Sequence, residues 1–174
     1  TERQDIRITS VSLTSYSAGF GAVREILKTP ENHAIIRRII LGDSSYGSLD
    51  DTLLQKGERV VIPEHVAPWA AFGKLALTGE KTLLMTSSEI QPGSYAGTHE
   101  VCRAVAMELG VEIHSPAEDP EKSITAENPY PLAQQAQQGG FLWWGYKGQD
   151  SRVHMTLARR LGDAWAALDA AGYP

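Results

Sequence analysis

Residues 8–27 read ITSVSLTSYSAGFGAVREIL, and the order of residue types in this stretch decides the fold class. Residues 8–14 alternate apolar with hydroxyl side chains and are rich in β-branched residues, which predicts a β-strand. A corner of small residues follows. Residues 22–27 then have helical spacing until Pro30 ends the pattern. The stretch therefore predicts a strand, a sharp turn and a helix.

The alternation of strand and helix continues along the rest of the chain. Short apolar runs predict further strands at residues 39–41, 81–85 and 141–146. Apolar residues at helical spacing predict helices at residues 49–55, 66–77, 97–109 and 155–171. Such repeated strand-helix units predict an α/β domain, with a mainly parallel sheet, right-handed connections and helices on both faces.

We expect residues 1–174 to form a single domain that contains one long surface excursion. Residues 115–139 carry four prolines and the polar run QQAQQ. Irregular segments of this length inside a compact domain are commonly functional. The segment is therefore predicted to be a long loop, part of which covers a site as a lid would.

Composition excludes several classes of protein. The chain has 16 Lys and Arg against 21 Asp and Glu, a formal net charge of −5, which argues against a nucleic-acid binder. The single Cys102 excludes an internal disulfide framework and a Cys-rich zinc module. No run approaches the roughly 18 apolar residues of a membrane span. His99-Glu100 and His114 lack the spacing of a metal hydrolase, so we expect neither a metal nor a cofactor.

The corner between the first strand and helix is the strongest chemical signal. Residues 15–19 read SYSAG and place Ser17 where a strained turn would present its hydroxyl above the sheet, as in a nucleophile elbow. The residues two before and two after must be small. Ser15 stands where Gly is usual, and Gly19 keeps the pattern. The backbone N–H of Ala18 could bind an oxyanion at the helix N-terminus. The alternative is that Ser17 only caps the helix.

A serine nucleophile needs a base and an acid that orients the base. His154 follows the last predicted strand, and loops after parallel strands emerge at the same edge of a sheet as the Ser17 corner. Asp43 and Glu89 follow the second and third predicted strands, and both preserve the order Ser, acid, His. Asp43 is the favoured acid because a carboxylate directly after a buried strand is costly without a partner. Glu89 remains the alternative.

These residues resemble the C-terminal half of the α/β-hydrolase superfamily, from the strand of the nucleophile elbow to the last helix. The resemblance implies a three-layer α/β fold, Ser17 as nucleophile, Ala18 as an oxyanion-hole donor and His154 as general base. Asp43 or Glu89 would orient the base, and Glu89 matches the commoner position of the family's acid. The implied activity is that of a serine hydrolase, which cleaves a small-molecule or peptide ester or amide through an acyl-enzyme.

The family normally has four or more strands before the elbow strand, whereas only residues 1–7 precede it here. We therefore expect an N-terminal segment or a partner chain to complete the sheet and to supply the second oxyanion donor. A signal peptide could lie in that part, so the compartment stays open.

Two other functions are compatible with the sequence. A non-catalytic binding or structural module could retain the same sheet. Thr1 could also be an N-terminal nucleophile, as in proteasome-like hydrolases. Such a residue should open a buried strand, and the charged sequence of residues 1–5 disfavours it.

Overall fold

The computed structural model describes residues 7–116, 119–122 and 124–174. These residues form a six-stranded sheet with the strand order β1-β2-β3-β6-β5-β4. The strands are β1 (Val11–Tyr16), β2 (Ile36–Gly42), β3 (Thr82–Ser88), β4 (Ile113–His114), β5 (Leu132–Gln138) and β6 (Phe141–Tyr146). β1, β2, β3 and β6 are parallel, while β5 and β4 join as antiparallel strands. The four strands predicted from the sequence are thus the four parallel ones.

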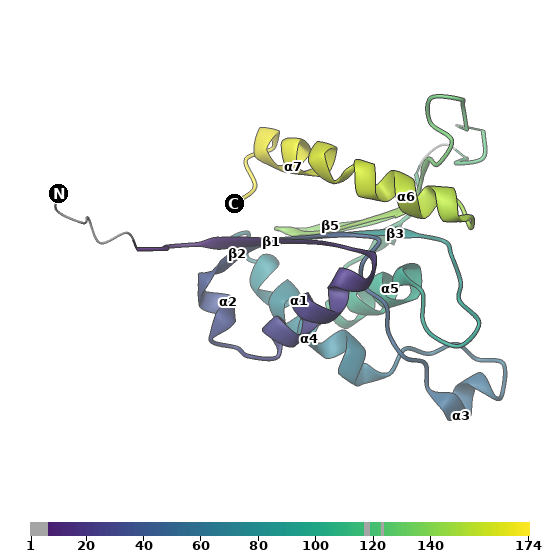
Figure 1. The fold of residues 1–174 in the computed structure, drawn as a ribbon, viewed down its shortest axis with the longest axis horizontal. Helices are drawn as coiled ribbons and strands as arrows, with labels where there is room; N and C mark the ends of the chain where they lie inside the picture. Colours follow the sequence, from purple (N-terminus) through teal and green to yellow (C-terminus); the bar gives the residue numbers. More distant parts are fainter. Residues whose placement is uncertain (1–6, 117–118, 123) are drawn as a thin grey trace.

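Helices cover both faces of this sheet, as predicted (Figure 1). The helical segments are η1 (Ser17–Gly19), α1 (Phe20–Leu27), α2 (Asn32–Ile35), α3 (Asp51–Leu54), α4 (Pro63–Ala76), α5 (Thr98–Glu108), α6 (Ser151–Arg159) and α7 (Leu161–Ala170). α1, α2, α4 and α5 lie on one face, and α6 and α7 lie on the other. The result is a three-layer arrangement with a mixed, mostly parallel sheet in the middle.

The core explains why the central strands read as unbroken apolar runs. In β2, Ile39 and Leu41 belong to the larger hydrophobic cluster beneath the sheet, whereas Ile40 packs into a smaller cluster under α7. A strand that is buried on both faces has no polar side to alternate with. Trp143 and Trp144 divide in the same way, because Trp143 packs into the larger cluster and Trp144 against the smaller one.

The excursion expected at residues 115–139 is shorter in the structure, because Leu132–Gln138 form strand β5. β5 pairs with β6 through a hairpin whose turn is Gly139-Gly140, and Gly139 has a φ of +55°. Only Ala133 and Ala136 of β5 are fully buried, while its glutamines lie at the partly or fully exposed positions. The polar glutamines made this strand read as a loop.

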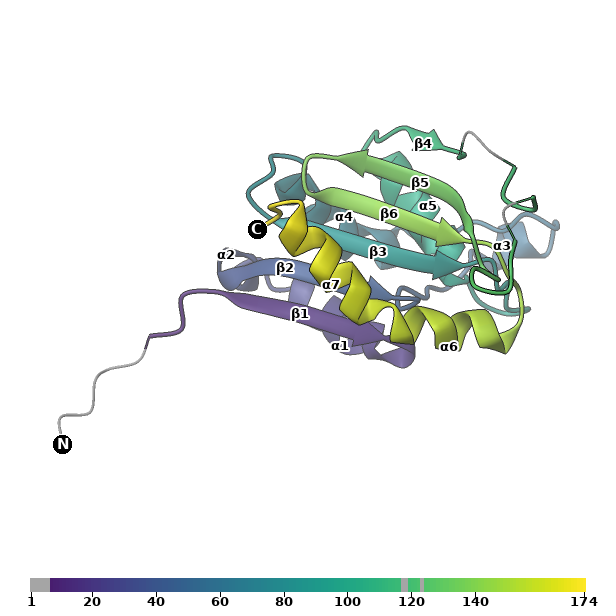
Figure 2. The same ribbon diagram turned by 90° about the horizontal axis from the view of Figure 1, so that it is seen from above.

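The single helix predicted at residues 155–171 is two helices in the structure, α6 and α7, and α6 begins earlier than predicted. α6 starts at Ser151, where the side chain of Asp150 accepts hydrogen bonds from the backbone N–H groups of Arg152 and Val153. His154 therefore lies in the first turns of α6 and not just ahead of a helix, where the predicted start at residue 155 would place it. Figure 2 shows α6 and α7 crossing above the sheet, with α6 near the ends of β1 and β3.

β1 is an edge strand, and β2 is its only strand neighbour in the described part of the chain (Figure 2). Its side chains alternate between the two layers. Leu13 packs against the larger cluster, and Thr14 accepts a hydrogen bond from Trp165 of α7. Among the described residues, no helix is both long enough and apolar enough to cross a membrane.

Candidate active site

The turn after β1 holds Ser17 in a strained conformation. Ser17 has a φ of +53°, in the left-handed region that costs a residue with a side chain about 1–2 kcal/mol. The turn also brings Gly19 against Ser15, since a Cβ placed on Gly19 would lie 3.1 Å from the Ser15 Cβ. Small residues at both positions are thus a steric requirement here. Neither η1 nor α1 has a side-chain cap hydrogen bond, so Ser17 does not serve as a helix cap.

Buried hydroxyl groups brace this turn from the end of β2. The Ser44 Oγ donates a hydrogen bond of 2.8 Å to the carbonyl oxygen of Ser17. The same Oγ lies 2.8 Å from the Ser15 Oγ, so it links both sides of the turn. Because Ser44 binds the backbone carbonyl of Ser17, these hydrogen bonds do not involve the Ser17 hydroxyl.

Asp43 directly follows β2 and is completely buried. Its Oδ1 accepts hydrogen bonds from the Ser88 backbone N–H, at 2.8 Å, and from the Thr98 hydroxyl. Its Oδ2 accepts a hydrogen bond of 2.9 Å from the Ser88 Oγ. A buried carboxylate is tolerated only when donors replace its hydration, and the end of β3 and the start of α5 supply them here. Asp43 is itself in the left-handed region, with a φ of +46°.

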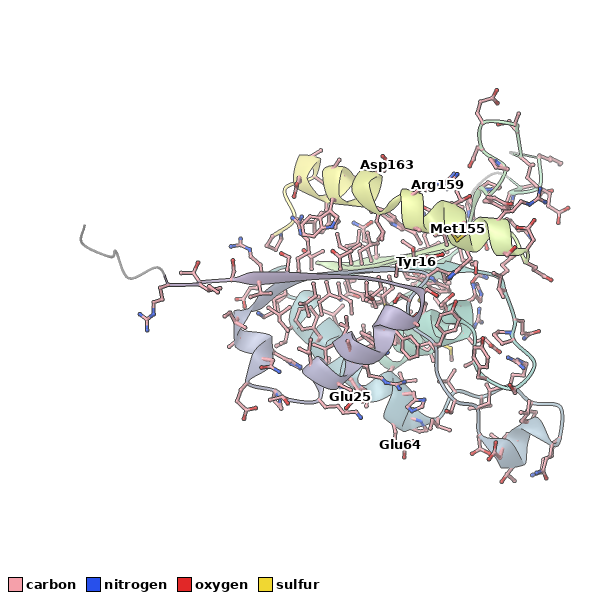
Figure 3. The ribbon with its side chains drawn as sticks, in the orientation of Figure 1. Tyr16, Glu25, Glu64, Met155, Arg159 and Asp163 are labelled. Carbon is pink, nitrogen blue, oxygen red and sulfur yellow. The ribbon has the colours of Figure 1, made fainter. Side chains whose placement is uncertain are left out.

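His154 meets Asp43 at the carboxyl edge of the sheet. The His154 Nδ1 lies 2.6 Å from the Asp43 Oδ2. A carboxylate can only accept, so Nδ1 carries the hydrogen and Nε2 is the free acceptor of the neutral ring. The Tyr16 ring stacks on the imidazole at a centroid distance of 4.6 Å and donates from its hydroxyl to the Met155 sulfur at 3.3 Å. Figure 3 shows Tyr16 lying beneath Met155.

Ser17 and His154 both line one cavity of about 570 Å³. The other lining residues are Ala18, Phe20, Arg24, Tyr46, Gly47, Ser48, His65 and Tyr95. Across the described part of the chain, no hydrogen bond joins the Ser17 hydroxyl directly to the His154 ring. Such contacts are often long in an unliganded enzyme and tighten when substrate binds.

Burial and the nearby Asp43 carboxylate raise the pKa of Tyr46 well above its ordinary value. Its hydroxyl therefore stays neutral at physiological pH and can donate a hydrogen bond. The cavity thus holds a hydroxyl nucleophile candidate, a histidine with a free acceptor nitrogen, and neutral donors. This combination is suited to acyl transfer.

The alternative acid Glu89 has a different role in the structure. Its Oε2 accepts a hydrogen bond of 3.2 Å from the Gly148 backbone N–H, and its Oε1 lies 3.6 Å from the Lys147 ammonium. Glu89 therefore holds the loop between β6 and α6 and does not contact His154. The alternative nucleophile Thr1 lies outside the described residues. In the described ranges, no group of His, Cys, Asp and Glu side chains is arranged to hold a metal ion.

Sequence reasoning missed the side chains that support the site: Ser44, Ser88 and Thr98. A signal for them exists, because a buried Asp43 requires donors and hydroxyl residues 86–88 directly follow the neighbouring predicted strand. Which hydroxyls reach the carboxylate depends on strand register and on the position of α5, neither of which the sequence specifies.

No family model matches this chain, and neither a curated protein nor a solved structure is found to be similar to it. The site is therefore interpreted from its own geometry. Three features carry that interpretation: the strained Ser17, the Asp43–His154 pair, and the cavity that Ser17 and His154 share.

Proposed function

We propose that this protein is a serine hydrolase of the α/β-hydrolase type, which cleaves a carboxylic ester or amide through an acyl-enzyme. The observation that carries the proposal is the 2.6 Å contact between the buried Asp43 and His154, on the cavity that Ser17 also lines. A histidine with a purely structural role has no need to line a cavity that a strained serine also lines. Backbone strain clusters at active sites, and a carboxylate that orients a histidine is a recurring part of serine hydrolase sites.

In the proposed reaction, the His154 Nε2 takes the proton from the Ser17 hydroxyl as its Oγ attacks the substrate carbonyl carbon. The negative charge that develops on the carbonyl oxygen is stabilised by the Ala18 N–H at the start of the helical segment. The resulting imidazolium then gives its proton to the leaving alcohol or amine. Water, deprotonated by the same Nε2, attacks the acyl-enzyme, and Ser17 regains its proton.

Asp43 would act through His154 and not on the substrate. Its carboxylate fixes the tautomer of the ring and stabilises the imidazolium that forms after proton transfer. The three other hydrogen bonds to Asp43 keep the carboxylate in place without a competing cation. Stacking on Tyr16 fixes the plane of the ring, so the orientation of Nε2 is set from two sides.

The free edge of β1 supports a second part of the proposal. An edge strand presents unpaired N–H and C=O groups, and β1 leads directly into the Ser17 turn. We propose that a strand from another segment or from a partner chain pairs with this edge and supplies a second oxyanion donor. Purification of the chain as a stable, fully active monomer would contradict this part.

A non-catalytic binding module is the second candidate function. It is favoured by the lack of a direct hydrogen bond between Ser17 and His154 among the described residues. Such a module would bind a ligand in the same cavity without covalent chemistry, and Ser17→Ala would leave that binding almost unchanged.

Steady-state hydrolysis of p-nitrophenyl esters tests the proposed function. Ser17→Ala and His154→Gln should each lower kcat by about 10⁴-fold or more, as loss of the nucleophile or base does in triad enzymes. Ser12→Ala is the matched control, because Ser12 is an exposed serine on β1, the strand that leads into the Ser17 turn. Hydrolysis by Ser17→Ala at the wild-type rate would refute the proposal.

A further inference from the structure

Arg24 places a positive charge on the wall of the candidate active-site cavity. Phe20 and Arg24 are four positions apart in α1 and therefore lie on one side of that helix. Ser17 and Phe20 line the same cavity as Arg24. The nucleophile candidate, an aromatic ring and a guanidinium therefore share one cavity.

The contacts of Arg24 leave much of its hydrogen-bonding capacity unused. Its guanidinium carbon lies 5.2 Å from the centre of the Phe20 ring, which supports one face of the group. Its single hydrogen bond in the described structure is a long one of 3.4 Å from Nη1 to the Tyr46 carbonyl oxygen. Its Nε is buried and has no hydrogen-bond partner in the part of the chain that the structure describes. A guanidinium held by its face keeps its N–H edge free for a carboxylate.

Among the described residues, no acidic side chain lines the cavity beside this charge. Asp43 is committed to His154, Ser88 and Thr98. The nearby Glu25 accepts a hydrogen bond of 2.6 Å from Lys28 on the exposed side of α1. Figure 3 shows Glu25 and Glu64 on the outer side of the lower helical layer. A part-buried cation with no acidic side chain beside it on the cavity wall is expected to bind an anion there.

His65 adds a neutral donor to the same cavity. Its Nδ1 accepts a hydrogen bond of 2.7 Å from the Ser48 backbone N–H, which leaves the hydrogen on Nε2. Burial, together with the positive charges of Arg24 and Lys28, lowers the pKa of His65. His65 therefore stays neutral at pH 7 and offers one N–H. One guanidinium edge and one neutral donor match a singly charged carboxylate better than a doubly charged phosphate.

We propose that the substrate is an acyl compound with a carboxylate, which Arg24 binds at the far end of the chain from the bond that Ser17 attacks. This inference rests on the proposed serine hydrolase function and names its substrate class. Ser17, Phe20 and Arg24 all line the cavity of about 570 Å³. The substrate thus resembles a half-ester of a dicarboxylic acid, with its methylene chain over Phe20.

Matched substrates test this assignment. The first measurement compares kcat/KM for p-nitrophenyl half-esters of adipate, suberate and sebacate with p-nitrophenyl esters of uncharged fatty acids of equal length. Wild type should prefer the charged series, and Arg24→Gln should reduce that preference by about 10- to 100-fold, the worth of one charge-assisted hydrogen bond. Arg37→Gln is the control, because it removes the same charge near the start of β2, the end of the strand away from Asp43. It should leave the preference unchanged.

A binding measurement separates this inference from the hydrolase proposal. Calorimetry with the Ser17→Ala protein should detect monomethyl suberate but not dimethyl suberate, and the added Arg24→Gln change should abolish binding of the charged ligand. Equal binding of both ligands, or binding unaffected by Arg24→Gln, would overturn the carboxylate assignment. If carboxylate binding depends on Arg24 but no ester is hydrolysed, the assignment stands and the hydrolase proposal fails. If hydrolysis depends on Ser17 but shows no preference for charged substrates, the hydrolase proposal stands and the carboxylate assignment fails.

Discussion

Replacement of Ser17 by glycine should make the fold more stable than replacement by alanine, although both changes remove the proposed nucleophile. The reason is the φ of +53° at this position. Alanine keeps a Cβ and therefore keeps the strain, whereas glycine adopts the left-handed region freely. The hydrogen bond from Ser44 reaches the Ser17 carbonyl, so both variants retain it.

The size of the difference follows from two opposing effects. A residue with a side chain pays about 1–2 kcal/mol in the left-handed region. Glycine avoids this strain, but it loses more conformational freedom on folding than alanine does, which offsets roughly 0.5–1 kcal/mol of the benefit. Ser17→Gly should therefore exceed Ser17→Ala by about 0.5–1 kcal/mol in the free energy of unfolding, or roughly 1–4 °C in Tm for a chain of this size.

Urea and thermal unfolding of the two variants measure this difference. Ser12, an exposed residue within β1, provides the control pair, because a strand position disfavours glycine. Ser12→Gly should be less stable than Ser12→Ala, the opposite order to that at Ser17. If Ser17→Gly is also the less stable variant of its pair, the turn stores no strain and the argument for a nucleophile elbow loses its main physical support.

Three further predictions follow from the site and the core. Asp43→Asn should lower kcat by about 10³- to 10⁴-fold in ester hydrolysis, because the ring of the histidine loses its anionic partner; Glu89→Gln should stay near wild type, and an equal loss in both variants would contradict the assignment of the acid. Burial raises the pKa of the Cys102 thiol to about 12, so iodoacetamide should modify it at pH 8 only after denaturation, and rapid labelling of the folded protein would contradict its burial. Gly19→Val should destabilise the fold and reduce activity. Gly21→Ala adds a Cβ in open space within α1 and should raise the free energy of unfolding by about 0.5–1 kcal/mol. Unfolding midpoints that move in the same direction for both variants would refute this contrast.

The sequence predicts β2, β3 and β6 well because these strands are buried on both faces, whereas the edge strand β1 is predicted from its alternation of apolar and hydroxyl residues. Runs such as residues 39–41 and 83–85 are continuous and apolar, and helical spacing follows most of them. β5 was missed because it buries only Ala133 and Ala136. Its place in the sheet depends on the Gly139-Gly140 hairpin and on pairing with β6, which is tertiary information. The break between α6 and α7 likewise leaves no clear mark in the pattern of apolar residues.

The candidate site was partly predictable for a related reason. Ser17, Asp43 and His154 follow strands, and topology brings strand ends to one edge. The choice of Asp43 over Glu89 rested on the cost of a buried carboxylate, and the structure places Asp43 against His154. The hydroxyls that hold Asp43 come from β3 and α5, 45 and 55 positions away along the chain. Their convergence requires the register of the folded sheet, which spacing alone does not give.

Labelling with a fluorophosphonate probe, followed by peptide mapping of the modified residue, tests the central claim most directly. The account predicts a single adduct on Ser17 in wild type, much slower labelling in Asp43→Asn and His154→Gln, and none in Ser17→Ala. The protein should be examined together with any chain that co-purifies, so that the β1 edge is complete. A folded assembly that remains unlabelled, or an adduct on another residue, would contradict the claim that Ser17 is an activated nucleophile.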